Sequence, residues 1–171
     1  MRILRFLTLS TSLLLLTSFL AGPTAADEVR VPVANDLQAE AIQAEDRKLP
    51  ILVLFSSSYC GYCTIVREDF LEPMLKSGDY KDKVIIRMIS IDGSDDLRDF
   101  DGKQVDPEIF ADNRGVFVTP TVKFFGPDGN ETSQDLVGLM TVDYYGGYID
   151  AAIEESLAQL RNGKQKLAQT K

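Results

Sequence analysis

The stretch Ile51–Val66, ILVLFSSSYCGYCTIV, decides the fold of this chain. Its first five residues, Ile51–Phe55, are all apolar and predict a strand covered on both faces, and a polar turn at 56–59 then leads into a helix. Cys60 and Cys63 lie on the first turn of that helix and are the only two cysteines among the 171 residues. The N-terminus of a helix offers unpaired N–H groups and a partial positive charge, which favour a thiolate. The sequence therefore predicts a dithiol that ionises and cyclises easily, as disulfide exchange requires.

The rest of the chain alternates helices with strands. A helix joins the first two strands, so these strands should be parallel with a right-handed crossover. The order predicts an α/β fold, with a central mixed sheet flanked by helices on both faces. The expected elements are a helix from a cap at Asn35 or Asp36 to about Lys48, the strand Ile51–Phe55, the cysteine helix through Phe70 with Pro73 ending or kinking it, a strand within Lys83–Asp92, a short helix from Asp106 to about Asn113, a strand at Val122–Phe125, its hairpin partner within Thr132–Val137, and a last helix after Thr141.

Two further segments have a definite pattern. The acidic stretch Gly93–Val105 lacks the spacing of a calcium-binding loop, so we expect a solvated loop there. The last helix should bury one stripe of side chains, consisting of Tyr145, Ile149, Ala152, Ile153, Ser156 and Leu160.

The first 26 residues are typical of a secretory signal peptide. Arg2 and Arg5 form a basic start, Phe6–Leu20 is an apolar run, and the small residues that follow suit cleavage after Ala26. The run is shorter than the roughly 20 residues of a membrane-spanning helix, which disfavours a retained anchor. The remaining chain divides into an N-terminal extension and helix at 27–48, a main domain at 49–160 and a polar tail at 161–171.

The composition excludes several classes of function. Without residues 1–26 the chain has 16 basic and 26 acidic residues, a net charge of −10, so nucleic acid and anionic membrane surfaces are poor partners. The absence of histidine excludes Ser–His and Cys–His catalysis and leaves a zinc site short of ligands. A purely structural disulfide is an alternative, but a loop this short removes little entropy from the unfolded chain.

With a Thr-Pro pair opening a later strand, the C-x-x-C helix resembles the thioredoxin superfamily. The resemblance covers nearly all of Leu49–Leu160 and is carried by Phe55–Cys63, by Val118–Val122 and by Gly138 before the last helix. It implies the thioredoxin fold and no cofactor. The most similar members are exported thioredoxin-like proteins of the bacterial periplasm, so we expect a periplasmic location.

The resemblance also assigns roles to residues. Cys60 is expected to be the exposed nucleophile and Cys63 the buried resolving thiol, and together they form the redox-active disulfide. Pro120 corresponds to the family's cis-proline, whose cis bond turns the backbone of Thr119 outward to pair with an extended substrate strand. The alternative is an ordinary trans proline at the start of an edge strand. Thr119, Pro120, Tyr59 and Tyr62 are the expected substrate-binding residues, and no metal site is expected.

The chain departs from the cytoplasmic thioredoxins at several positions. Those proteins have a tryptophan before the motif and a proline inside it, where this chain has tyrosines. Their buried acid and its lysine partner correspond to Leu54 and Met88, so the internal proton relay is absent. Proton transfer to or from Cys63 must then use water or another group, with Glu68 and Asp69 on the same helix as the candidates.

The direction of electron flow follows less directly. The Gly-Tyr pair between the cysteines resembles the periplasmic disulfide isomerases, but those carry a dimerisation domain, and only Asp27–Pro50 precedes the strand here. We therefore expect a monomeric reductase of disulfide-containing client proteins, supplied by a membrane thiol electron donor, ahead of an oxidase or isomerase. Alternatives from other classes are a binding module that captures a client or delivers copper through the two cysteines, and a domain with an inert disulfide.

Overall fold

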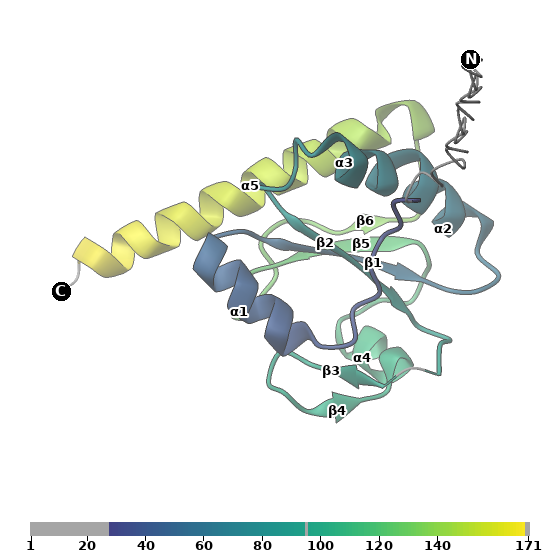
Figure 1. Cartoon of the computed structure of the whole chain (residues 1–171), viewed down its shortest axis with the longest axis horizontal. Coiled ribbons are helices and arrows are strands. Elements are labelled where there is room, and N and C mark those ends of the chain that lie inside the picture. The colour runs from purple at the N-terminus through teal and green to yellow at the C-terminus, as the bar shows by residue number, and fades with distance from the viewer. Residues whose placement is uncertain (1–27, 95, 170–171) are drawn as a thin grey trace, which may run out of the picture.

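The computed structural model describes residues 28–94 and 96–169, and it describes side chains up to residue 162. One mixed sheet lies between two layers of helices (Figure 1). The predicted signal peptide, 1–26, lies outside the described residues. In chain order the elements are α1 (Leu37–Arg47), β1 (Ile51–Ser56), α2 (Gly61–Ile65), the π-helical segment η1 (Val66–Leu71), α3 (Glu72–Ser77), β2 (Ile85–Ser90), β3 (Leu97–Arg98), β4 (Gln104–Val105), α4 (Pro107–Asn113), β5 (Thr121–Phe125), β6 (Leu136–Val137) and α5 (Val142–Gln169).

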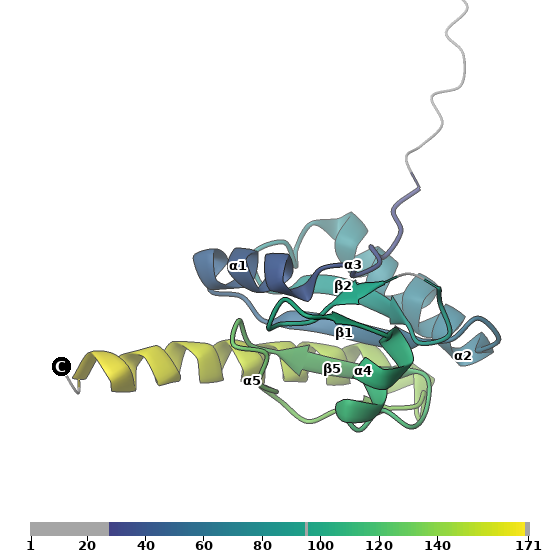
Figure 2. The same ribbon diagram turned by 90° about the horizontal axis from the view of Figure 1, so that it is seen from below.

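The central sheet has the strand order β2-β1-β5-β6. Strand β1 is parallel to β2 and antiparallel to β5, and β6 returns antiparallel to β5. Figure 2 shows β2, β1 and β5 side by side in this order. This arrangement confirms the predicted mixed sheet, with the parallel pair formed across the cysteine helix. A short lead-in covers the outer edge of β2, where Ala34 N–H donates to the Met88 carbonyl (2.8 Å) and Met88 N–H donates to that of Pro32 (2.9 Å).

Every residue of β1 is buried, because helices cover both faces of the sheet. On one face Phe55 stacks on Phe110 of α4, with ring centroids 6.2 Å apart, and α1 covers the same face. The other face is covered by α5 and by the continuous helix of α2, η1 and α3, which meet where the rings of Phe70 and Tyr145 are 5.3 Å apart. Alternation along β1 places Leu54 on this second face, beneath the helix that carries the cysteines.

Pro73 does not end the cysteine helix. The chain stays helical from Gly61 to Ser77, and Glu72 N–H bonds to the carbonyl of Arg67, five residues earlier. Proline lacks the N–H of a regular α-helix, and the π-helical turn changes the bonding pattern just before it. The helix ends at Ser77, followed by Gly78 with φ 74°.

The prediction of a solvated loop at Gly93–Val105 is wrong in part. This stretch contains β3 and β4, a small antiparallel pair that forms a second sheet. The Asp99 carboxylate accepts the N–H groups of Asp101 (2.9 Å) and Lys103 (2.8 Å) and so closes the turn between the two strands. Each strand has two residues, too few for alternation to be recognised in the sequence.

The last helix begins at Val142 and continues to Gln169, so it includes most of the stretch 161–171 that was expected to be a polar tail. Its far end extends beyond the sheet (Figure 1). The inner stripe is as predicted except at its end, where Leu157 is buried and Leu160 is only half-buried. Among helices in the described part of the chain, none combines the length and hydropathy that crossing a membrane requires.

Candidate redox site

The turn after β1 places Cys60 at the start of a helix. Ile91 N–H donates to the Ser56 carbonyl (2.8 Å) at the end of β1, and Cys60 N–H donates to the Ser57 carbonyl (3.2 Å) inside the turn. Cys60 is then the N-cap of α2, where its sulfur accepts the N–H of Cys63 at 3.1 Å. Unpaired N–H groups are what a helix start offers, and a sulfur held there is stabilised as a thiolate.

Cys60 and Cys63 form a disulfide, with the sulfurs 2.03 Å apart and the Cα atoms 5.2 Å apart. Cys63 is buried, with 2% of its surface exposed, whereas Cys60 is partly exposed. An incoming sulfur can therefore approach Cys60 more easily than Cys63.

The structure brings the loop that contains Thr119 and Pro120 next to the turn that precedes Cys60. The Thr119–Pro120 peptide bond is cis. The hydroxyl of Ser57, in the turn before Cys60, lies 3.1 Å from the hydroxyl of Thr119. On the other side of this loop, Gly138 N–H donates to the Pro120 carbonyl (2.7 Å), which ties the end of β6 to the proline.

Several exposed apolar side chains belong to the segments that form this junction. Tyr59 is 99% exposed and Tyr62 is 63% exposed, so both predicted tyrosines face solvent beside the cysteines. Three short segments meet here, namely 57–62, 116–120 and 137–140, and none of them contains a charged residue. We call their exposed apolar residues the apolar collar, consisting of Tyr59, Tyr62, Phe117, Val118, Val137 and Met140.

Four collar residues were not predicted from the sequence: Phe117, Val118, Val137 and Met140. Their apolar side chains suggest core positions when read without the fold. The usable signal was their place in the chain, because Phe117 and Val118 directly precede the Thr-Pro pair and Met140 follows Gly138 by two residues.

A carboxylate adjoins the turn from the end of β2. Asp92 accepts the N–H of Ser58 at 2.8 Å and the hydroxyl of Ser90 at 3.0 Å. The Ser58 N–H, and to a lesser extent the Ser90 hydroxyl, hold the pKa of Asp92 below its usual value. This carboxyl group therefore remains ionised at neutral pH.

No ionisable group replaces the missing proton relay at the corresponding positions. Leu54 lies opposite Met88 on β2 and opposite Val122 on β5, and none of its surface is exposed. Glu68 is exposed and pairs with Arg67 (2.6 Å), and Asp69 is also exposed. Across residues 28–94 and 96–169, no group of three or more His, Cys, Asp or Glu residues is placed to hold a metal ion.

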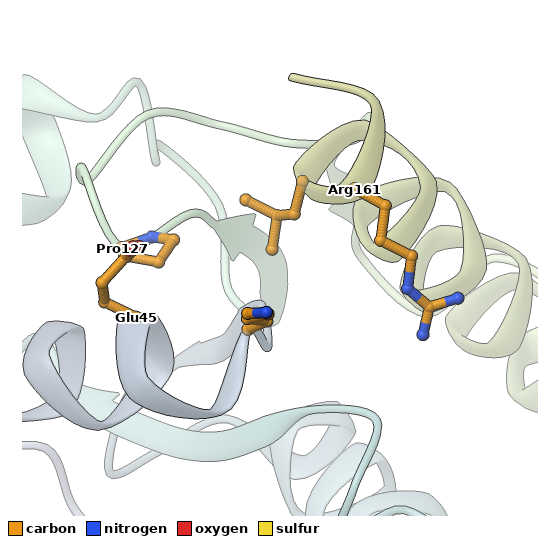
Figure 3. Close-up of a pocket in the computed structure, with 5 residues that line it drawn as sticks. Glu45, Pro127 and Arg161 are labelled. Carbon is orange, nitrogen blue, oxygen red and sulfur yellow. The ribbon is translucent and has the colours of Figure 1, made fainter. Parts of the chain in front are cut away.

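A separate pocket lies at the opposite end of β1 from the cysteines. It has a volume of about 190 Å³ and lies between the end of α1, the turn after β5 and α5 (Figure 3). Its lining consists of Glu45, Lys48, Pro127, Leu160 and Arg161. No residue of the candidate redox site contributes to it.

A family model described as a thioredoxin-like domain matches residues 37–153, from the start of α1 into α5. The chain belongs to this thioredoxin-like family. The matched range contains the cysteine pair and the cis-proline. The thioredoxin-like fold agrees with the mixed sheet and its two helical layers.

The solved structures that this chain is similar to include mitochondrial thioredoxin 3 from Saccharomyces cerevisiae in its oxidised form. That comparison has 15% sequence identity and a TM-score of 0.49, and it covers 73% of this thioredoxin-like chain and 94% of the yeast chain. Another is a chain from the structural study of the thiol resolving mechanism in yeast mitochondrial 1-Cys peroxiredoxin via glutathione/thioredoxin systems, with 16% identity and a TM-score of 0.47, covering 70% and 94%. No curated protein matches the sequence.

Proposed function

We propose that this protein is an exported thiol–disulfide oxidoreductase that reduces disulfides in client proteins. The observation that carries the proposal is the Cys60–Cys63 disulfide at a helix start, with Cys60 partly exposed beside the cis-proline loop. A structural disulfide has no need of an exposed sulfur at a helix N-terminus, whereas exchange chemistry requires one. Export rests on the signal-peptide pattern of residues 1–26.

The reaction has two exchange steps. The Cys60 thiolate attacks one sulfur of the client disulfide, so a Cys60–client bond forms and the client's other sulfur leaves as a thiolate. The Cys63 thiol then loses its proton and attacks Cys60, which closes the protein disulfide and releases the second client thiol. Two electrons pass from the protein dithiol to the client. The N–H of Cys63 stabilises the Cys60 thiolate before the attack, and water takes the proton of the buried Cys63.

Client binding is assigned to the loop and the collar together. In this proposal the backbone at Thr119 pairs with an extended client segment next to Cys60. The cis Thr119–Pro120 bond and the contact between the Ser57 and Thr119 hydroxyls support this assignment. Tyr59, Tyr62 and the other collar residues then contact the side chains that flank the client cysteine. The uncharged collar suits apolar flanking residues and gives no charged anchor for an acidic or basic segment.

The catalytic cycle also requires a second partner. The oxidised Cys60–Cys63 pair must be reduced again by a thiol donor, which we assign to a membrane protein on the exported side. In this scheme the protein acts as a monomer, with Cys60 serving first the client and then the donor.

A trapping experiment tests the assignment of the two cysteines. Cys63→Ser removes the resolving thiol, so the Cys60–client bond should accumulate as a covalent adduct that reductant releases. Cys60→Ser is the matched control and should give no adduct, because the buried Cys63 is not available to clients. Adducts should be captured from cells by acid quenching and alkylation, then identified on non-reducing gels. An adduct in the control but not in Cys63→Ser would reverse the roles.

The reduction potential tests the direction. Equilibration against a glutathione series should give about −270 mV for a reductase, whereas about −120 mV would show a donor of disulfides. A pair that never equilibrates with glutathione would refute the oxidoreductase function.

A further inference from the structure

The turn that carries Cys60 is held by a side chain from the segment that follows β2. Ser58 lies two residues before Cys60, and its N–H donates to Oδ2 of Asp92 at 2.8 Å across a sequence separation of 34 residues. The other carboxylate oxygen, Oδ1, accepts the Ser90 hydroxyl at 3.0 Å. Both oxygens of this exposed carboxylate therefore have a donor, and the two hydrogen bonds together favour the orientation that faces the turn.

This contact continues the pairing of β1 with β2 beyond the end of the strands. The last paired residues are Ser56 and Ser90, and Ile91 N–H donates to the Ser56 carbonyl. After Ser56 the backbone leaves the sheet, so the next N–H on this side has no strand to pair with. The Asp92 carboxylate supplies the missing acceptor, two residues beyond the last pair on its own strand.

The turn is therefore held from both neighbouring strands. On the β5 side, the hydroxyl of Ser57 contacts that of Thr119. On the β2 side, Ser58 is bonded to Asp92. Between these contacts and the helix lie only Tyr59 and the N-cap Cys60, so the position of the sulfur depends on where the turn is fixed.

We propose that Asp92 is a positioning residue, which fixes the turn so that the Cys60 sulfur stays within reach of the Cys63 N–H. The inference rests on the proposed role of Cys60 as the reacting thiol. If the turn loosens, Cys60 moves from the N-cap position and its thiolate loses that hydrogen bond for part of the time. A thiolate with fewer donors is less stable, so the pKa of Cys60 should rise and the thiolate fraction at neutral pH should fall.

The charge of Asp92 predicts the opposite effect. A carboxylate near a thiolate repels it, so a purely electrostatic Asp92 would raise the pKa of Cys60, and its removal would lower it. The segments 57–62, 116–120 and 137–140 contain no charged residue, and their titratable groups besides Cys60 are Tyr59 and Tyr62. The charged residues on the cysteine helix, which include Arg67, Glu68 and Asp69, are the same in every variant. The sign of the change thus separates positioning from charge repulsion.

Three variants of the full chain separate the hydrogen bond from the charge. Asp92→Ala removes both. Asp92→Glu keeps the charge but moves the carboxylate by one methylene away from its place opposite Ser58. Asp92→Asn removes the charge and keeps an oxygen that accepts the Ser58 N–H. The pKa of Cys60 should be measured in each reduced protein from the rate of iodoacetamide alkylation between pH 5 and 9, with the modified cysteine identified by mass spectrometry.

Positioning predicts that Asp92→Glu and Asp92→Ala both raise the pKa of Cys60, by about 0.5 to 1 unit, and so slow alkylation below that pKa about three- to tenfold. Asp92→Asn should stay at the wild-type pKa or below it. The idea is overturned if Asp92→Glu matches wild type, or if Asp92→Ala lowers the pKa as Asp92→Asn does. If Asp92→Ala fails to fold, the Glu and Asn pair alone decides.

Melting temperatures of the same proteins show whether a change in the pKa of Cys60 merely reflects a general loss of stability. A general loss of stability would not distinguish Asp92→Glu from Asp92→Asn in the way that positioning predicts. The alkylation assay reads the thiol and needs no client. Failure of the trapping experiment would therefore refute the proposed function without affecting this result, and an unchanged pKa would refute the role of Asp92 without affecting the trap.

Discussion

The dry environment beneath the cysteine helix leads to a quantitative prediction. Leu54 has no exposed surface and lies between Met88 and Val122 on the neighbouring strands. Leu54→Asp would place a carboxyl group there, and Leu54→Asn is the matched control. Both variants lose the packing of the leucine and gain a polar group of the same size, but only the aspartate can ionise.

The expected effect depends on pH. In the unfolded chain the new aspartate has a pKa of about 3.9, and burial in an apolar site raises a carboxyl pKa by up to about 3 to 5 units. The carboxyl pKa is higher in the folded than in the unfolded protein, so both states are protonated below about pH 4. The variant then loses stability as the pH rises from the unfolded-state pKa to the folded-state pKa. The loss is about 1.4 kcal/mol per pH unit, or about 4 kcal/mol between pH 4 and pH 7. That is a large part of a typical unfolding free energy of about 5 to 15 kcal/mol.

Urea denaturation of the oxidised proteins at pH 4, 5, 6 and 7, followed by far-UV circular dichroism, measures this difference. The unfolding free energy of Leu54→Asp, relative to Leu54→Asn, should fall steadily with rising pH. A constant difference would show that water or a cation reaches the site, and the argument that the chain lacks an internal proton relay would then fail.

Two further predictions concern buried polar groups. The hydroxyl of Tyr145 has no hydrogen-bond partner among the described residues, and burial raises its pKa to about 12. Tyr145→Phe should therefore leave the unfolding free energy unchanged or raise it by about 1 kcal/mol. A lower unfolding free energy in a urea titration would show that the hydroxyl has a partner. The Lys123 side chain is 3% exposed, and its ammonium contacts Glu131 (2.8 Å) and Asp135 (2.7 Å). Lys123→Met should lower the unfolding free energy by about 1 to 3 kcal/mol. The loss is smaller than for a fully buried ion pair because both carboxylates reach solvent. Burial alone lowers the pKa of Lys123, but the two carboxylates outweigh burial and the pKa is raised. The difference in unfolding free energy between wild type and Lys123→Met should therefore persist at neutral pH and shrink only above about pH 10.5. A difference that already shrinks below pH 9 would contradict this.

Local chemistry made several elements predictable from the sequence. Asp36 caps α1 by accepting the N–H of Ala39 at 2.9 Å, and Asp106 does the same for α4 with Glu108 at 2.8 Å. These interactions involve residues two or three positions apart, so the sequence contains all that determines them. The apolar run at Ile51–Phe55 was equally informative, because a strand buried on both faces needs no alternation.

The missed features lack a pattern that a single sequence shows. The π-helical bond of Glu72 and the β3–β4 pair have no periodic pattern that a sequence shows. In the site, the cysteine and Thr-Pro motifs identified the central residues. Phe117 and Met140 are exposed there, although their large apolar side chains are of the kind usually found in a core. Whether an apolar side chain is buried or joins a binding surface is decided by tertiary packing, which a single sequence does not contain.

The lead-in at Pro32–Ala34 has a consequence for how this protein avoids aggregation. A sheet with an exposed edge strand risks pairing with any other exposed strand, including one from a second copy. Here the outer edge of β2 is occupied by the lead-in, whose Pro32 has no N–H to offer, and the opposite edge strand, β6, is only two residues long. Both edges of the sheet are thus poor templates for indiscriminate pairing. In the function that we propose, an extended client segment pairs instead with the loop beside Cys60, where it meets the reacting sulfur.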